Sequence, residues 1–371
     1  MNVTSPLRSL PAELVLMIME SLKCPFSIRA FAFSYPRALH LLQTYRQRVS
    51  ETAVRAFDRK LPIEKTFGYD VRACRLRLDL RNVAFLDPAE AKQKVCKADF
   101  YGGWCNLNLL CEMTSLNNEI DRFISRYPVH AWNKIQDDYA REFSHGWAGV
   151  SRFELYQTVD LSDSELRRLR EAFLGFECKR HHLVYDKSLL HETKLHQAML
   201  LPIYNKDSFS EGYFVGNSFN GACLSIFCFI FQCYENLIRR VDRQLELEES
   251  RQDSEPQRSE LVRIARFRMR TRNEELRYIA LLCLQGYACL TVAEQYTDDE
   301  LRQFVLKSFM WFCKDGTNHI PDPCGKLVSN LEHFSPEYYP DGDTACEPWS
   351  RGRFFWDQAR MLDLLERATV D

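Results

Sequence analysis

The chain has 371 residues, with 49 Lys and Arg against 51 Asp and Glu, and a net charge of −2. A chain of this length buries about three-quarters of its unfolded surface, so it does not need a disulfide or metal staple. Its balanced charge provides no general attraction to nucleic acid or to an anionic membrane, and we predict neither as a partner. The fourteen cysteines are scattered, without a Cys-x-x-Cys pair, which predicts reduced thiols in the cytoplasm or the nucleus.

The first predicted helix begins at about Leu10 and is unusually apolar. Pro11 suits the first helical position, because its missing N–H would be unpaired there, and Glu13 lies near the positive end of the helix dipole. The apolar run is too short for a membrane span and lacks the basic flank of a secretory signal. Such a helix has to be covered on more than one side, by its own core or by another chain. One face carries Leu14, Met17, Ile18 and Leu22, and other sides carry Val15, Leu16 and Met19.

Two short amphipathic segments follow between Phe26 and Arg48. They are separated at Tyr35, because Pro36 disfavours helix in the residue before it. We therefore expect residues 1–60 to form a small three-helix unit.

The most clearly marked helix of the chain begins after Ser162. Ser162 caps it, Glu165 completes a capping box, and Leu161 can pack against Leu166 as a hydrophobic staple. The helix is predicted to bury Leu166, Leu169, Phe173 and Phe176 and to expose Arg167, Arg168, Arg170 and Lys179 to solvent.

Further helices are predicted in the second half of the chain. Residues 220–249 are aromatic at their start and charged at their end, which predicts that the first half of this helix is domain core. Residues 246–260 are almost free of apolar side chains and predict an exposed connection. The apolar run 278–293 predicts a buried helix. After Phe312 we expect loops and then a last helix with Phe354, Phe355, Trp356, Met361 and Leu364.

A basic run precedes the apolar segment. Acidic residues follow it at Glu274 and Glu275, so we predict a solvated helix face with ion pairs one turn apart rather than a nucleic-acid site. The run contains Arg263, Arg266, Arg268, Arg270 and Arg272.

Motifs for catalysis or cofactor binding are missing from the sequence. His191 and His196 are five residues apart, whereas the helical zinc-protease motif needs four. Gly216 and Gly221 have neither phosphate-loop nor dinucleotide spacing. We therefore predict no metal, no cofactor and no catalytic residue, although a Cys-His hydrolase, whose residues meet only in space, stays open.

The opening segment resembles an F-box, the helical module that attaches substrate receptors to the Skp adaptor of cullin-RING ubiquitin ligases. The resemblance rests on Leu10-Pro11-x-Glu13-Leu14, followed by Ile18, Leu22, Pro25 and Ile28. Ser34 and Arg37 stand where many family members have a Cys-x-x-Trp pattern. The resemblance implies adaptor contacts from Leu10, Pro11, Leu14, Ile18 and Leu22, with Leu39 and Leu42 as further candidates.

The predicted fold is all-α, with an F-box-like module at residues 6–52 and a helical, substrate-recruiting domain at residues 61–371. Residues 161–177 and 351–361 are similar to segments of fungal F-box proteins. The resemblance implies a non-catalytic substrate receptor that links an unknown protein target to the ligase. Two alternatives stay open: an intracellular helical scaffold whose N-terminal helices pack only on their own core, and the unrecognised hydrolase.

Overall fold

The computed structural model describes residues 10–58, 73–75, 77–78, 107–144, 159–180, 184–185, 203–204, 218–249, 258–313, 355–360 and 362. These residues are predominantly helical, which confirms the all-α prediction. The exception is an antiparallel pair of two-residue strands, β1 (Val184–Tyr185) and β2 (Ile203–Tyr204). The chain divides into two compact units, residues 1–83 with 93–118, and residues 84–92 with 119–371. The first unit thus extends beyond the module expected at residues 6–52.

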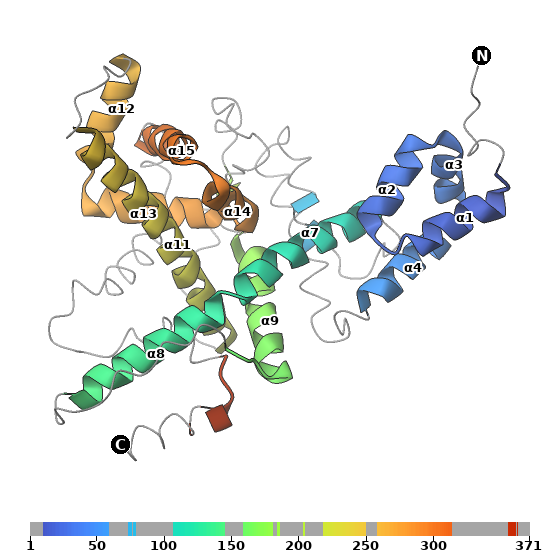
Figure 1. The fold of residues 1–371 in the computed structure, drawn as a ribbon, viewed down its shortest axis with the longest axis horizontal. Coiled ribbons are helices and arrows are strands. Elements are labelled where there is room, and N and C mark those ends of the chain that lie inside the picture. Colours follow the sequence, from blue (N-terminus) through green and yellow to red (C-terminus); the bar gives the residue numbers. More distant parts are fainter. Residues whose placement is uncertain are drawn as a thin grey trace. The chain divides into compact units, whose positions relative to one another are not determined.

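Residues 10–58 of the first unit form four helices rather than the expected three (Figure 1). They are α1 (Ala12–Ser21), α2 (Pro25–Ser34), α3 (Pro36–Thr44) and α4 (Arg46–Asp58). Tyr35 separates α2 from α3 in an extended conformation, as Pro36 predicts. Pro11 is the residue before α1 and not its first helical residue, because its ψ of 150° is outside the helical range.

The four helices pack on one another through small and aliphatic side chains. Helix α1 contacts α3 and α4, and α3 also contacts α2. Arg48 of α4 forms an ion pair with Glu20 of α1. The interior of this bundle contains Val15, Leu16, Met19, Ile28, Ala32, Ala38, Leu41, Val49 and Ala53.

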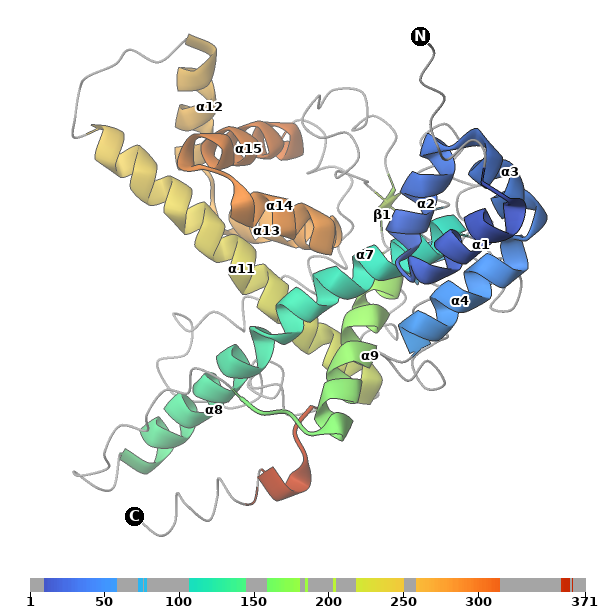
Figure 2. The ribbon, with the colours of Figure 1, turned by 45° about the vertical axis from the view of Figure 1, so that its right-hand side comes forward.

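Helix α11 (Ser218–Glu249) is the central element of the second unit (Figure 2). Helices α9 (Asp163–Arg180), α13 (Arg272–Leu284), α14 (Tyr287–Gln295) and α15 (Asp298–Trp311) all pack along it. The buried residues of its first half, from Ile226 to Tyr234, confirm the predicted core. Helices α8 (Tyr127–Ser144) and α12 (Arg258–Arg268) also belong to the second unit, and α12 packs on α15. Helix α7 (Leu107–Ile124) begins in the first unit and ends in the second.

Aromatic rings fill the interior of the second unit. The ring of Phe173 on α9 lies 6.4 Å from that of Phe123 and 5.6 Å from that of Tyr287, measured between centroids. Tyr127 at the start of α8 meets Phe229 of α11 edge-on at 5.2 Å. These separations are those at which aromatic pairs attract beyond their burial of area, so the cluster joins four helices and the end of α7.

The apolar run 278–293 is buried as predicted, but it is two helices rather than one. Gly286 has a φ of 83°, which favours glycine because it has no Cβ, and the chain bends there between α13 and α14. Among the described residues, no single helix has the length and apolarity to span a membrane. Residues 274–283 and 287–295 meet these criteria together, but with a bend of 108°.

Helix α11 ends at Glu249, as the predicted helix at residues 220–249 does. Two other boundaries differ from the prediction. Helix α12 already begins at Arg258, inside the expected connection at residues 246–260. The expected last helix begins later than predicted: Phe355 and Trp356 form a turn and are buried, and residues 358–360 and 362 are helical.

Candidate functional site

The outer face of α1 carries two apolar side chains that the first unit leaves uncovered. Leu14 is 43% exposed and Met17 is 58% exposed, whereas Val15 and Met19 are completely buried. Helical spacing explains the division, since Val15 and Met19 are one turn apart and lie opposite Leu14 and Met17. Of the predicted face with Leu14, Met17, Ile18 and Leu22, the first two are therefore exposed and the last two are half-buried.

The other predicted adaptor-contact residues differ in their exposure. Pro11 is exposed, and Leu10, Ile18 and Leu22 are half-buried. In α3, Leu39 is half-buried, but Leu42 is only 9% exposed. The structure thus places Leu42 in the interior of the first unit, and we leave it out of the candidate surface.

Arg37 fixes the start of α1. Its Nη1 donates a hydrogen bond to the carbonyl oxygen of Leu10 at 2.6 Å. Ser34 donates its hydroxyl to the carbonyl of Phe31 at 3.0 Å. Arg37 and Ser34 therefore both have structural contacts within the first unit.

Helix α2 exposes two phenylalanines that the sequence analysis did not select. Phe26 is 37% exposed and Phe33 is 70% exposed. They are seven residues apart and so share one face, and the guanidinium of Arg29 lies 5.3 Å from the centroid of the Phe26 ring. The spacing was visible in the sequence, but α2 is apolar on several sides, so the spacing did not distinguish an outer face from an inner one.

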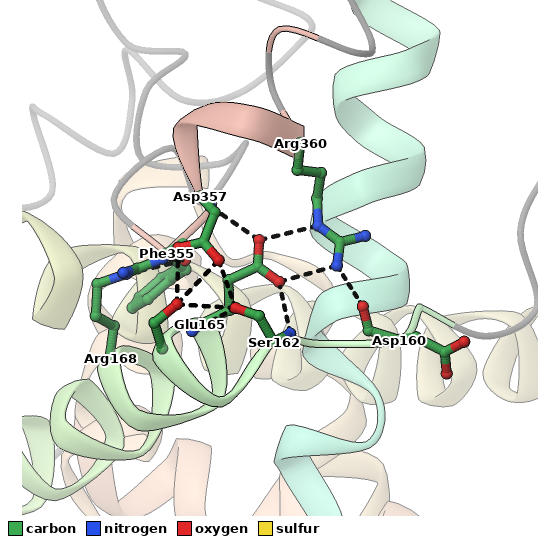
Figure 3. Close-up of polar contacts among 8 residues, drawn as sticks. Asp160, Ser162, Glu165, Arg168, Phe355, Asp357 and Arg360 are labelled. Atoms are coloured by element: carbon green, nitrogen blue, oxygen red, sulfur yellow. Dashed lines mark hydrogen bonds and ion pairs between the residues drawn. The ribbon is translucent and has the colours of Figure 1, made fainter.

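A second group of functional interest lies at the start of α9 (Figure 3). The predicted capping box is confirmed: the Glu165 N–H donates to Ser162 Oγ at 3.1 Å, and the Ser162 N–H donates to Glu165 Oε2 at 3.0 Å. Of the predicted apolar face, Leu169, Phe173 and Phe176 are buried and Leu166 is half-buried.

The chain segment 355–360 attaches to this helix start, nearly two hundred residues away in sequence. Ser162 and Ser164 donate their hydroxyl groups to the Asp357 carboxylate, and Arg168 Nη2 donates to Asp357 Oδ1 at 2.6 Å. The hydrogen bonds from Ser162, Arg168 and Ser164 lower the pKa of Asp357 to about 2. Asp357 is thus held as a carboxylate by three side chains of α9 and its cap.

Glu165 connects α9 to the same segment through an ion pair in which the carboxylate belongs to the helix and the arginine, Arg360, belongs to the segment. Its carboxylate accepts hydrogen bonds from Arg360 Nε and Nη2, both at 2.9 Å, and from the Asp357 N–H at 2.8 Å. Burial opposes the ionisation of Glu165, but the hydrogen bonds from Arg360 and from the backbone of Asp357 and Ser162 outweigh it and lower the pKa of Glu165. Arg360 also donates to the carbonyl oxygen of Asp160.

Two arginines of α9 are not on a solvated face, contrary to the prediction. Arg168 donates to Asp357 and to the carbonyl of Phe355, and Arg170 is buried and forms an ion pair with Asp121 at 2.5 Å. Arg167 is exposed and lies near Glu171, as expected for a surface residue. The side chain of Lys179 lies outside the described residues.

The basic run is largely engaged within the second unit. Arg266 pairs with Glu274, and Arg270 pairs with Asp242 at 2.6 Å and with Glu275 at 3.1 Å. Arg268 donates to the carbonyl of Leu245. Acidic and carbonyl partners from α11 and α13 therefore already hold these guanidinium groups.

The remaining candidate groups are the cysteines, the histidines and the glycines that the sequence analysis considered. Cys111, Cys233, Cys283 and Cys313 are free thiols, and burial raises the pKa of Cys233 to about 12. Within the described ranges, no group of three or more His, Cys, Asp or Glu side chains could hold a metal ion. The segment His191 to His196 and Gly216 lie outside the described residues. Gly221 lies in α11, but its burial is not described.

Comparison with known proteins found no relative. No protein-family model matches the chain, and no curated protein or solved structure matches it.

Proposed function

We propose that the chain is a non-catalytic F-box-type substrate receptor of a fungal cell, located in the cytoplasm or the nucleus. The first unit would bind a Skp adaptor and, through it, a cullin-RING ligase, and the second unit would recruit a protein substrate. Ubiquitin transfer would be done by other subunits, so this chain would supply proximity and orientation.

The observation that supports this proposal best is the division of α1 into two apolar faces. Val15, Leu16 and Met19 form the interior of the first unit, and Leu14 and Met17 remain exposed in the same helix. Exposed apolar side chains that gather on one helix face are typical of surfaces that bind another protein. The exposed face includes Leu14, which belongs to the Leu-Pro-x-Glu-Leu resemblance.

The scaffold alternative expects a different burial pattern. If the N-terminal helices packed only on their own core, α1 would be covered on all its apolar sides. Leu14 and Met17 do not meet that expectation, so we prefer the adaptor-binding function.

Calorimetric titration of the purified full chain with a Skp adaptor tests the proposal. Met17→Asp is expected to weaken binding at least about thirtyfold, because a charge buried in an apolar contact costs more than about 2 kcal/mol. The matched control is Met269→Asp, since Met269 is 74% exposed in the second unit and should not contact the adaptor.

Two results would contradict the proposal. Failure of the unsubstituted chain to bind adaptor at micromolar concentration would remove the F-box function. Equal loss of affinity in Met17→Asp and Met269→Asp would show that α1 is not a specific contact.

A further inference from the structure

The segment 355–360 is held by two buried aromatic side chains and by polar contacts around them, as a bound peptide often is. Phe355 is 1% exposed and its ring meets that of Tyr127 edge-on at 5.4 Å. Trp356 is 6% exposed and its ring lies 5.1 Å from that of Trp132 on α8. Two buried aromatic anchors are thus inserted against aromatic side chains of α8, which is how the strongest contacts of protein interfaces are usually built.

Polar contacts surround these anchors and are partly open to water. The side chains of Arg168 and Asp357 are each 32% exposed, and that of Arg360 is 27% exposed. The guanidinium of Arg360 also lies 5.6 Å from the Trp132 ring. A buried aromatic centre with a polar, accessible rim is the usual arrangement of a protein-binding surface.

The polar contacts also fix the direction of the segment. Asp357 meets the donors Ser162, Ser164 and Arg168, whereas Arg360, three residues later, meets the carboxylate of Glu165 and a carbonyl. A segment with the two charges exchanged would place arginine against arginine and carboxylate against carboxylate. The surface therefore distinguishes Asp-x-x-Arg from Arg-x-x-Asp.

The receiving side chains come from parts of the chain far from the segment. The hydrogen-bonded partners are separated from it by 187 to 200 residues. The same side chains of α8 and α9 would therefore accept an equivalent segment that is not part of the chain.

We propose that this surface of α8 and α9 is a peptide-binding site for a partner protein with an exposed Phe-Trp-Asp-x-x-Arg segment, and that residues 355–360 occupy it in the free chain. A partner segment binds by displacing the chain's own segment. The internal segment lowers the apparent affinity for the partner by the fraction of molecules in which the site is vacant. Weakening the internal segment should therefore strengthen binding of the external one.

The test uses the full chain with Trp356→Ala and Asp357→Ala together, and a labelled peptide of residues 353–362 with the natural sequence. Fluorescence anisotropy should show at least tenfold tighter binding to the double variant than to the unsubstituted chain. The control peptide has the same composition, with its Asp and Arg exchanged, and should bind at least tenfold more weakly.

Three outcomes would overturn the proposal. The double variant could keep its helical circular dichroism and fail to bind the peptide, or it could bind both peptides equally. It could also form dimers that exclude the peptide, which would assign the site to a second copy of the chain.

A second measurement covers a double variant that does not fold. A protease site inserted between residues 330 and 350 leaves the sequence of residues 355–360 and of α8 and α9 unchanged, and cleavage then makes the segment a separate peptide. Exchange of this peptide with added labelled peptide, with retained helical circular dichroism, supports the proposal. Permanent retention, or unfolding upon release, contradicts it. Neither measurement involves the adaptor, so this proposal and the proposed function fail independently.

Discussion

Two surfaces of the molecule differ in how their apolar side chains are covered. On α8, Tyr127 and Trp132 are covered by Phe355 and Trp356 of the same chain. On α1, Leu14 and Met17 have no such cover and remain exposed. Removing apolar surface of either kind from water lowers the free energy. The difference indicates that the surface of α8 is filled by residues 355–360 in the free chain, whereas the apolar face of α1 is left exposed.

The largest effect is expected for a core residue of the second unit. Phe173→Ala should lower the free energy of unfolding by about 3–5 kcal/mol, because it removes a completely buried ring from the aromatic cluster. Phe33→Ala in the first unit, where the ring is 70% exposed, should change it by less than about 0.5 kcal/mol. Denaturant unfolding followed by circular dichroism measures both. Similar losses would show that Phe33 is covered in solution.

Two methionines of α1 provide a closer comparison. Met19→Ala should destabilise the first unit by about 2–4 kcal/mol, since Met19 is completely buried. Met17→Ala should cost only a few tenths of a kcal/mol, because its side chain is 58% exposed. Thermal melting of the two variants tests the assignment of inner and outer faces. The reverse order would mean that α1 is rotated about its axis.

These faces also show what the sequence could predict and what it could not. Local signals were sufficient where a residue determines the conformation of its neighbours. Pro36 keeps Tyr35 extended, so α2 ends at Ser34, and Ser162 with Glu165 starts α9. The sequence predicted that the segment containing α1 is helical, but it did not determine which side of α1 faces the interior of the first unit. Because α1 is apolar nearly all round, its inner face depends on which helices pack against it.

The contacts of the surface on α8 and α9 depend on distant parts of the chain. Arg168 lies opposite the apolar face of α9, so its sequence position is that of a solvated residue. Its partners, Phe355 and Asp357, are nearly two hundred residues away, and no local pattern connects them. The break at Gly286 was missed for a related reason, since the apolar run continues on both sides of it.

Two glutamates that accept hydrogen bonds from an arginine should differ in their contributions to stability. Glu165→Gln should cost about 1.5–3 kcal/mol, because its carboxylate is 1% exposed and accepts hydrogen bonds from Arg360. Glu20→Gln should cost less than about 1 kcal/mol, since its partner Arg48 is 61% exposed. Urea unfolding at low and high salt compares them, and only the Glu20 pair should weaken markedly with salt.

The smallest effect is a local release of residues 355–360 in acid. The pKa of Asp357 is lowered to about 2 by the hydrogen bonds from Ser162, Arg168 and Ser164, whereas an unfolded Asp titrates near about 3.9. The contribution of this carboxylate is therefore complete above about pH 4 and is lost as the pH falls through about 2. Because Trp356 lies against Trp132, tryptophan fluorescence should report the release. Asp357→Asn is the control, since it cannot ionise and should lack this acid step; an unchanged step in that variant would assign the transition to another group.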